Sequence, residues 1–147
     1  MKTSAKSVSV NAAELLDAFA FVSAGLLYEH SAAICIDTGR IYLASSMIET
    51  EEDLPEDLET SDRYIAVPHK TELGLGRDLA LSFIDRELPG DYTTAAGFFR
   101  RKGAYGRFKQ LLHSRNMLER WYDFESSSTE QALRAWCEEN GIQVVWA

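Results

Sequence analysis

The sequence predicts an α+β fold, in which a small, mostly antiparallel sheet is covered by helices and the C-terminal half is helical. Most segments with strand-like apolar patterns lie before residue 68, whereas helical periodicity dominates from residue 71 onward. Strand-rich sequence followed by helix-rich sequence is typical of α+β rather than alternating βαβ proteins. The chain has 147 residues, of which 46% are hydrophobic, so we expect a single domain spanning 1–147.

The first predicted element is a helix that begins near residue 11. Asn11 followed three residues later by Glu14 is typical of a helix N-terminus, because the Asn side chain can accept a hydrogen bond from an unpaired backbone N–H. Apolar residues then recur at spacings of three and four until about Gly25. We therefore expect an amphipathic helix over this segment.

A β-hairpin and a third strand are predicted next. Two apolar runs, 32–36 and 41–44, flank a turn in which Gly39 can adopt a positive φ. The apolar run 63–67 predicts a strand that ends before Pro68.

Between the hairpin and the third strand lies an acidic loop, 49–62, with eight Asp and Glu residues and no Lys or Arg. We expect a solvated loop whose like charges keep it extended. The alternative is that the loop docks on a basic surface of its own or a neighbouring chain.

The remaining segments predict helices and a final strand. A helix within 71–87 is closed by Leu88-Pro89-Gly90, and Gly141 is a C-terminal stop signal. The other predicted elements are helices over 93–101, 104–113, 117–125 and 129–140, and a strand over 142–146.

Composition favours a cytoplasmic protein. The N-terminus has no signal-peptide core, and no run of about 18 uncharged apolar residues predicts a transmembrane helix. Cys35 and Cys137 each lie in an apolar pattern, which is typical of buried thiols in a reducing cytosol. The three histidines lack the spacing of a metal pair, so we expect neither a metal site nor a cofactor.

The candidate binding segment is basic inside an acidic protein. Residues 100–120 carry seven Lys and Arg against one acid, whereas the whole chain has a formal charge of −8. Such polarity steers the encounter with a partner without identifying it. The candidate partner-binding or nucleic-acid-binding residues are Arg100, Arg101, Lys102, Arg107, Lys109 and Arg115.

The same segment carries a family resemblance. Residues 101–109, Arg-Lys-Gly-Ala-Tyr-Gly-Arg-Phe-Lys, together with 121–124 and 135–142, resemble the uncharacterised bacterial protein family numbered zero-one-five-eight. Tyr105 and Gly106 depart from the family pattern, in which we expect Phe and Arg. The resemblance implies a bacterial cytosolic protein and brings no established activity.

Three classes of function remain open. We favour a non-catalytic protein-binding or adaptor domain, which would show an exposed apolar patch rimmed by charge. The alternative is RNA or DNA binding through residues 100–120, since clustered bases neutralise phosphates and aromatic rings such as Phe108 and Trp121 could stack on unpaired bases. However, the same spacing equally predicts two core stripes. One predicted helix would carry Tyr105, Phe108, Leu111 and Leu112, and the next would carry Leu118, Trp121, Tyr122 and Glu125. An enzyme of unidentified class is the weaker alternative.

Overall fold

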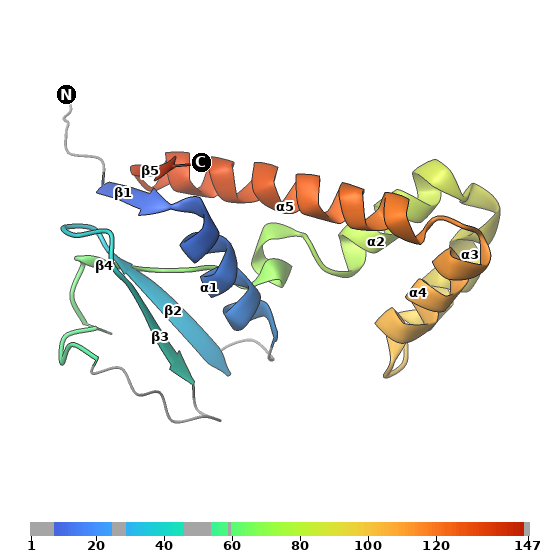
Figure 1. Cartoon of the computed structure of the whole chain (residues 1–147). Helices are drawn as coiled ribbons and strands as arrows, with labels where there is room; N and C mark the ends of the chain where they lie inside the picture. The colour runs from blue at the N-terminus through green and yellow to red at the C-terminus, as the bar shows by residue number, and fades with distance from the viewer. Residues whose placement is uncertain (1–7, 25–28, 46–53, 59, 146–147) are drawn as a thin grey trace. The chain divides into compact units, whose positions relative to one another are not determined.

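The computed structural model describes residues 8–24, 29–45, 54–58 and 60–145, and these form two compact units. Unit 1 comprises Met1–Leu73 and Leu133–Ala147, and unit 2 comprises Gly74–Ala132. The mixture of helices with a three-stranded antiparallel sheet and a two-stranded parallel sheet confirms the predicted α+β class (Figure 1).

Unit 1 contains both sheets. Strands β2 (His30–Cys35), β3 (Ile41–Ser45) and β4 (Tyr64–Ala66) form the antiparallel sheet in the order β3-β2-β4. Strands β1 (Val8–Asn11) and β5 (Ile142–Val145) pair in parallel, with Val8 opposite Ile142. The predicted final strand does not join the antiparallel sheet, because β5 pairs with β1, a strand that was not predicted from the sequence.

Helix α1 (Ala12–Ala24) follows β1 directly and covers the antiparallel sheet. Its predicted N-terminus is confirmed, because the backbone N–H of Glu14 donates to Oδ1 of Asn11 at 3.1 Å. Leu15 on α1 and Ile34 on β2 are both fully buried, so the core of this unit lies between the helix and the central strand. The single turn η1 (Lys70–Leu73) follows β4.

The predicted hairpin is also confirmed, with Ala33 opposite Tyr42 in the β2–β3 register. Gly39 has a φ of 79°, and a Cβ at this position would overlap the backbone carbonyl oxygen of Ser9 in β1. Two requirements therefore select glycine here, a left-handed backbone and close approach to a neighbouring strand.

Unit 2 is helical. It contains α2 (Arg77–Glu87), the turn η2 (Pro89–Asp91), α3 (Tyr92–Phe98), α4 (Ala104–Ser114) and the first part of α5 (Leu118–Glu139). Its core includes the fully buried side chains of Phe83, Phe108, Leu112 and Trp121. The predicted separate helices 117–125 and 129–140 are wrong, because α5 is continuous over 22 residues.

The acidic loop 49–62 lies only partly within the described residues. Of its acids, Glu49, Glu51, Glu52, Asp53 and Glu59 lie outside them. In the described part, the carbonyl oxygen of Asp57 accepts hydrogen bonds from the backbone N–H groups of Thr60 and Ser61. This part forms turns, as expected of a loop.

Candidate functional site

The predicted binding segment folds as the α3–α4 turn followed by α4. Gly103 adopts a left-handed conformation with a φ of 76° and is the N-cap of α4, where no side chain caps the helix. Arg100, Arg101 and Lys102 lie on the exposed turn just before it. The turn therefore places three bases beside the positive end of the helix dipole, an arrangement that only anions would stabilise.

The other end of α4 is closed by Asn116, which has a φ of 59°. The backbone N–H of Asn116 donates to the carbonyl oxygen of His113 at 3.1 Å, and that of Met117 donates to the carbonyl oxygen of Leu112 at 2.8 Å. These two bonds define a Schellman motif. Asn116 thus ends α4 rather than capping α5, and the sharp turn brings the first residues of α5 next to the last turns of α4.

The aromatic residues of the segment form the core of unit 2. The rings of Phe108 and Trp121 meet edge to face, with centroids 4.9 Å apart and planes at 87°. Both side chains are buried, as helical spacing predicted for a core stripe, and neither can stack on a nucleic-acid base. Tyr105 packs at the edge of the same cluster, and burial together with the charge of Glu125 raises its pKa.

Arg115, one of the six predicted site residues, forms an ion pair with Asp91. Nε of Arg115 donates to Oδ2 of Asp91 at 3.0 Å, and its Nη2 donates to Oδ1 at 3.0 Å. The hydrogen bond from Arg115 lowers the pKa of Asp91. Such a bidentate pair ties α4 to the end of η2, so Arg115 has a structural partner within unit 2.

Among the residues that the structure describes, the other five predicted site residues have no such partner. Arg100, Arg101, Lys102, Arg107 and Lys109 are exposed, and within the described part of the chain none lies within ion-pair distance of a carboxylate. By contrast, Nη2 of the neighbouring Arg120 lies 3.0 Å from Oε1 of Glu87. The positive charge of the segment is therefore uncompensated mainly on the α3–α4 turn and on α4.

A shallow groove of about 450 Å³ lies on the exposed side of α4. Its lining is mainly apolar and is formed by Gly106, Lys109, Gln110, His113, Ser114 and Leu118. No heavy atom outside the helix lies within 4 Å of the position that a Cβ of Gly106 would occupy. Gly106, which has no side chain, and the half-buried Leu118 of α5 are the two non-polar residues of this lining.

Lys109, which also lines this groove, contacts an aromatic ring. Its Nζ lies 5.7 Å from the ring centroid of Tyr122, whose side chain is 43% exposed. A cation over the face of a ring is held weakly at an exposed site. The groove, the five uncompensated bases and Tyr122 together are called the α4 face below.

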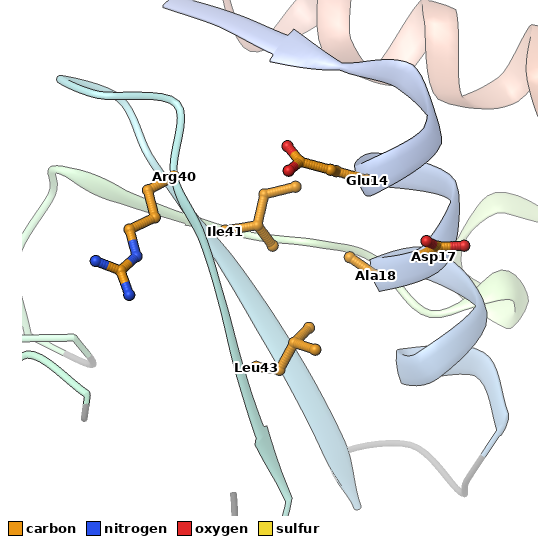
Figure 2. Close-up of a pocket in the computed structure, with 6 residues that line it drawn as sticks. All are labelled: Glu14, Asp17, Ala18, Arg40, Ile41 and Leu43. Carbon is orange, nitrogen blue, oxygen red and sulfur yellow. The ribbon is translucent and has the colours of Figure 1, made fainter. Parts of the chain in front are cut away.

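A second hollow, of about 350 Å³, lies in unit 1 between α1 and β3 (Figure 2). The side chains of Ile41 and Leu43 point toward α1, and the carboxylate of Glu14 extends from α1 toward the hairpin, whereas Arg40 extends away from the helix. Its lining residues are Glu14, Asp17, Ala18, Arg40, Ile41 and Leu43. Neither hollow was predictable from local sequence patterns, since each is assembled from two elements.

His69, Cys35 and Cys137 have reactive side chains and are buried parts of the fold. His69 is buried, with its Nδ1 2.9 Å from Oγ1 of Thr71. Cys35 and Cys137 are both buried and free, as predicted. Among the described residues, no three His, Cys, Asp or Glu side chains come close enough to hold a metal ion, and no helix is long and apolar enough to cross a membrane.

No family model, curated protein or solved structure matches this chain. The resemblance of residues 101–142 to the uncharacterised bacterial family therefore stays a prediction.

Proposed function

We propose that the protein is a non-catalytic binding protein, and that its α4 face contacts an acidic, amphipathic segment of a partner protein. The observation that carries this proposal is the juxtaposition of an apolar groove at Gly106 and Leu118 with five exposed bases that lack acidic partners among the described residues. An apolar patch rimmed by charge is the expected form of a protein-docking surface.

Charge and shape together suggest the chemistry of the partner. Gly106, Lys109, Gln110 and His113 recur at helical spacing, so the groove runs along α4. A partner helix could place apolar side chains in this groove and acidic ones opposite Arg107 and Lys109, which is the helix-in-groove mode of recognition. Opposite charges would also speed the encounter.

Nucleic acid is the second candidate. The uncompensated bases favour any polyanion, and the exposed ring of Tyr122 next to Lys109 could stack on an unpaired base. We rank this candidate second because Phe108 and Trp121, the two rings that the sequence offered for stacking on bases, are buried in the core. An enzymatic activity has no support of this kind among the described residues.

We propose a bacterial cytosolic setting for this binding. The family resemblance supports a bacterial origin. The two buried, free cysteines, Cys35 and Cys137, are compatible with a reducing compartment.

Fluorescence anisotropy distinguishes the candidates. The probes are a labelled acidic peptide with three repeats of Glu-Leu-Glu-Glu-Leu-Leu-Glu, a mixed-sequence single-stranded RNA and a duplex DNA, each titrated at about 50 and 200 mM salt. We expect the peptide to bind more tightly than either nucleic acid, and to bind more weakly at the higher salt. Tighter binding of RNA or DNA would favour the second candidate, and no binding of any probe would refute both.

Charge reversal locates the binding surface. The double variant Arg107→Glu/Lys109→Glu should weaken peptide binding by about ten-fold or more, because it replaces attraction with repulsion at the groove. The matched control is Arg77→Glu/Arg86→Glu, which changes the net charge of the same unit equally. Arg77 and Arg86 are exposed on α2, each within 4 Å of an adjacent acid. If the two double variants weaken peptide binding equally, only the net charge of the unit affects the affinity.

A further inference from the structure

Strand β3 is an edge strand within the described residues, because the antiparallel sheet has the order β3-β2-β4. The backbone N–H of Cys35 donates to the carbonyl oxygen of Arg40 at 2.9 Å, so the backbone of Arg40 faces β2. Backbone groups alternate in direction along an antiparallel strand. The N–H and C=O groups of Ile41 and Leu43 therefore point away from β2, toward the side on which no strand of the described residues pairs with β3.

The side chains beside this edge are incompletely covered. Ile41 and Leu43 lie opposite Ile34 and Ala32 in the register and so share their face of the sheet. Ile34 and Ala32 are buried, with 0% and 3% exposure, whereas Ile41 and Leu43 are only partly buried. Helix α1 thus covers the central strand and leaves the hollow of Figure 2 beside the edge strand.

The hollow is acidic on its α1 side. Glu14 and Asp17 of α1 line it, whereas Ala18 and the side chains of Ile41 and Leu43 are its apolar part. The positive charge of Arg40 lies away from α1. Its guanidinium is over the ring of Tyr42, 4.8 Å from the ring centroid. The sequence of unit 1 as a whole carries fifteen Asp and Glu against six Lys and Arg. The surroundings of this edge therefore favour a cationic ligand.

We propose that the edge of β3 binds an extended basic segment of a partner protein by strand addition. The added strand would pair with the outward backbone groups of Ile41 and Leu43. Every second side chain of the added strand would then lie on the α1 face, where an aliphatic residue contacts Ile41 and Leu43 and a Lys or Arg reaches Glu14 and Asp17. This surface and the α4 face share no residue, so the failure of one proposal leaves the other intact.

Amide hydrogen exchange of the full chain tests this proposal. The probe is the blocked synthetic peptide Thr-Val-Thr-Lys-Thr-Val-Thr-Lys, at a concentration that saturates an anisotropy titration. We expect the amides of Ile41 and Leu43 to exchange at least about ten-fold more slowly with peptide, because pairing protects them. The amide of Tyr42 faces β2 and should change little, which makes it an internal control.

Two control peptides separate strand pairing from simple charge attraction. A peptide in which every backbone nitrogen is methylated cannot donate these backbone hydrogen bonds, and one with Glu in place of Lys has the wrong charge. Neither should protect Ile41 or Leu43. Protection by the Glu peptide, or no protection by the Lys peptide at saturation, would overturn the proposal. Protection of Ile41 and Leu43 that increases with protein concentration in the absence of peptide would also overturn the proposal, because a second copy of the chain would then occupy the edge.

Charge reversal tests the acidic side of the hollow. Glu14→Lys/Asp17→Lys should weaken binding of the Lys peptide by about ten-fold or more. The control Glu138→Lys/Glu139→Lys makes the same change of charge on exposed residues of unit 1 at the end of α5 and should have less than about a two-fold effect. If the first variant does not fold, Asp17→Asn alone should still weaken binding, and unchanged affinity would contradict the proposed contact.

Discussion

At the scale of single residues, Gly39 carries the most specific structural requirement. Its φ of 79° strains any residue with a Cβ, and that Cβ would also overlap backbone of β1. Gly39→Ala should therefore lower the free energy of unfolding by more than about 2 kcal/mol, measured by urea denaturation. Gly141 has a similar φ of 68° but nothing within 4 Å of its Cβ position. The control Gly141→Ala should cost only about 1 kcal/mol, and equal costs would show that the contact with β1 is unimportant.

The two cysteines should differ in reactivity. Burial raises the pKa of Cys137 to about 11. Burial also acts to raise the pKa of Cys35, but hydrogen bonds from the Thr38 side chain and from the backbone of Asp37 and Thr38 lower it overall. Because the thiolate is the reactive form, iodoacetamide should modify Cys35 before Cys137 near neutral pH. Peptide mass spectrometry after timed quenching checks this order, and faster modification of Cys137 would contradict it.

At the scale of elements, the ion pair between Asp91 and Arg115 joins η2 to α4. We expect Asp91→Asn and Arg115→Gln to show a favourable coupling in a double-mutant cycle at neutral pH. The pKa of Asp91 is lowered in the folded protein. Its contribution is therefore present above the unfolded pKa of about 3.9 and is lost as the pH falls through the lower folded value. The coupling should shrink as the pH is lowered below about 3.9.

The pair Arg77–Asp78 provides the control for that cycle. Its atoms are 3.8 Å apart and both side chains are largely exposed, so its coupling should be close to zero at any pH. Coupling between Asp91 and Arg115 that does not change with pH, or that is no larger than in the control pair, would contradict the assigned role.

Gly106 lies inside α4, where glycine is unfavourable. Because its Cβ position is open, Gly106→Ala should raise the free energy of unfolding by about 0.5–1 kcal/mol. The added methyl group would partly fill the groove, so the same variant should bind the acidic peptide more weakly. Gly97→Ala in α3 also has an open Cβ position and should not alter binding. Urea denaturation and anisotropy measure the two effects, and unchanged binding by the Gly106 variant would argue against the groove.

Local patterns predicted some elements and missed others for physical reasons. The hairpin was predictable because Gly39 and two apolar runs lie within a few residues. Strand β1 was missed because its partner β5 lies at the other end of the chain. The interruption predicted within α5 was wrong because serine is only a moderately poor helix former, so residues 126–128 do not end the helix.

The candidate site was predictable in part. Sequence alone located the basic segment, and helical spacing correctly placed Phe108 and Trp121 in a core stripe. It could not show that Arg115 pairs with Asp91, since these residues lie 24 positions apart. Leu118 reaches the groove because the left-handed Asn116 turns the chain between α4 and α5, and no local sequence pattern predicts that turn.

At the scale of the whole molecule, charge is divided between the two units. The sequence of unit 1 is strongly acidic, whereas that of unit 2 carries nine Lys and Arg against eight Asp and Glu. The acidic β3 edge lies in the first unit, and the basic α4 face lies in the second. We infer that the protein binds partners of opposite charge at separate surfaces.

The measurement that tests the central claim most directly is an NMR titration of the isotopically labelled full chain with the acidic peptide. We predict that the largest amide shifts lie on α4 at Gly106, Lys109, Gln110 and His113 and on α5 at Leu118, with little change in α2 or β3. Shifts confined to unit 1, or the absence of shifts on α4 at saturating peptide, would contradict the proposal that the α4 face is a protein-binding surface.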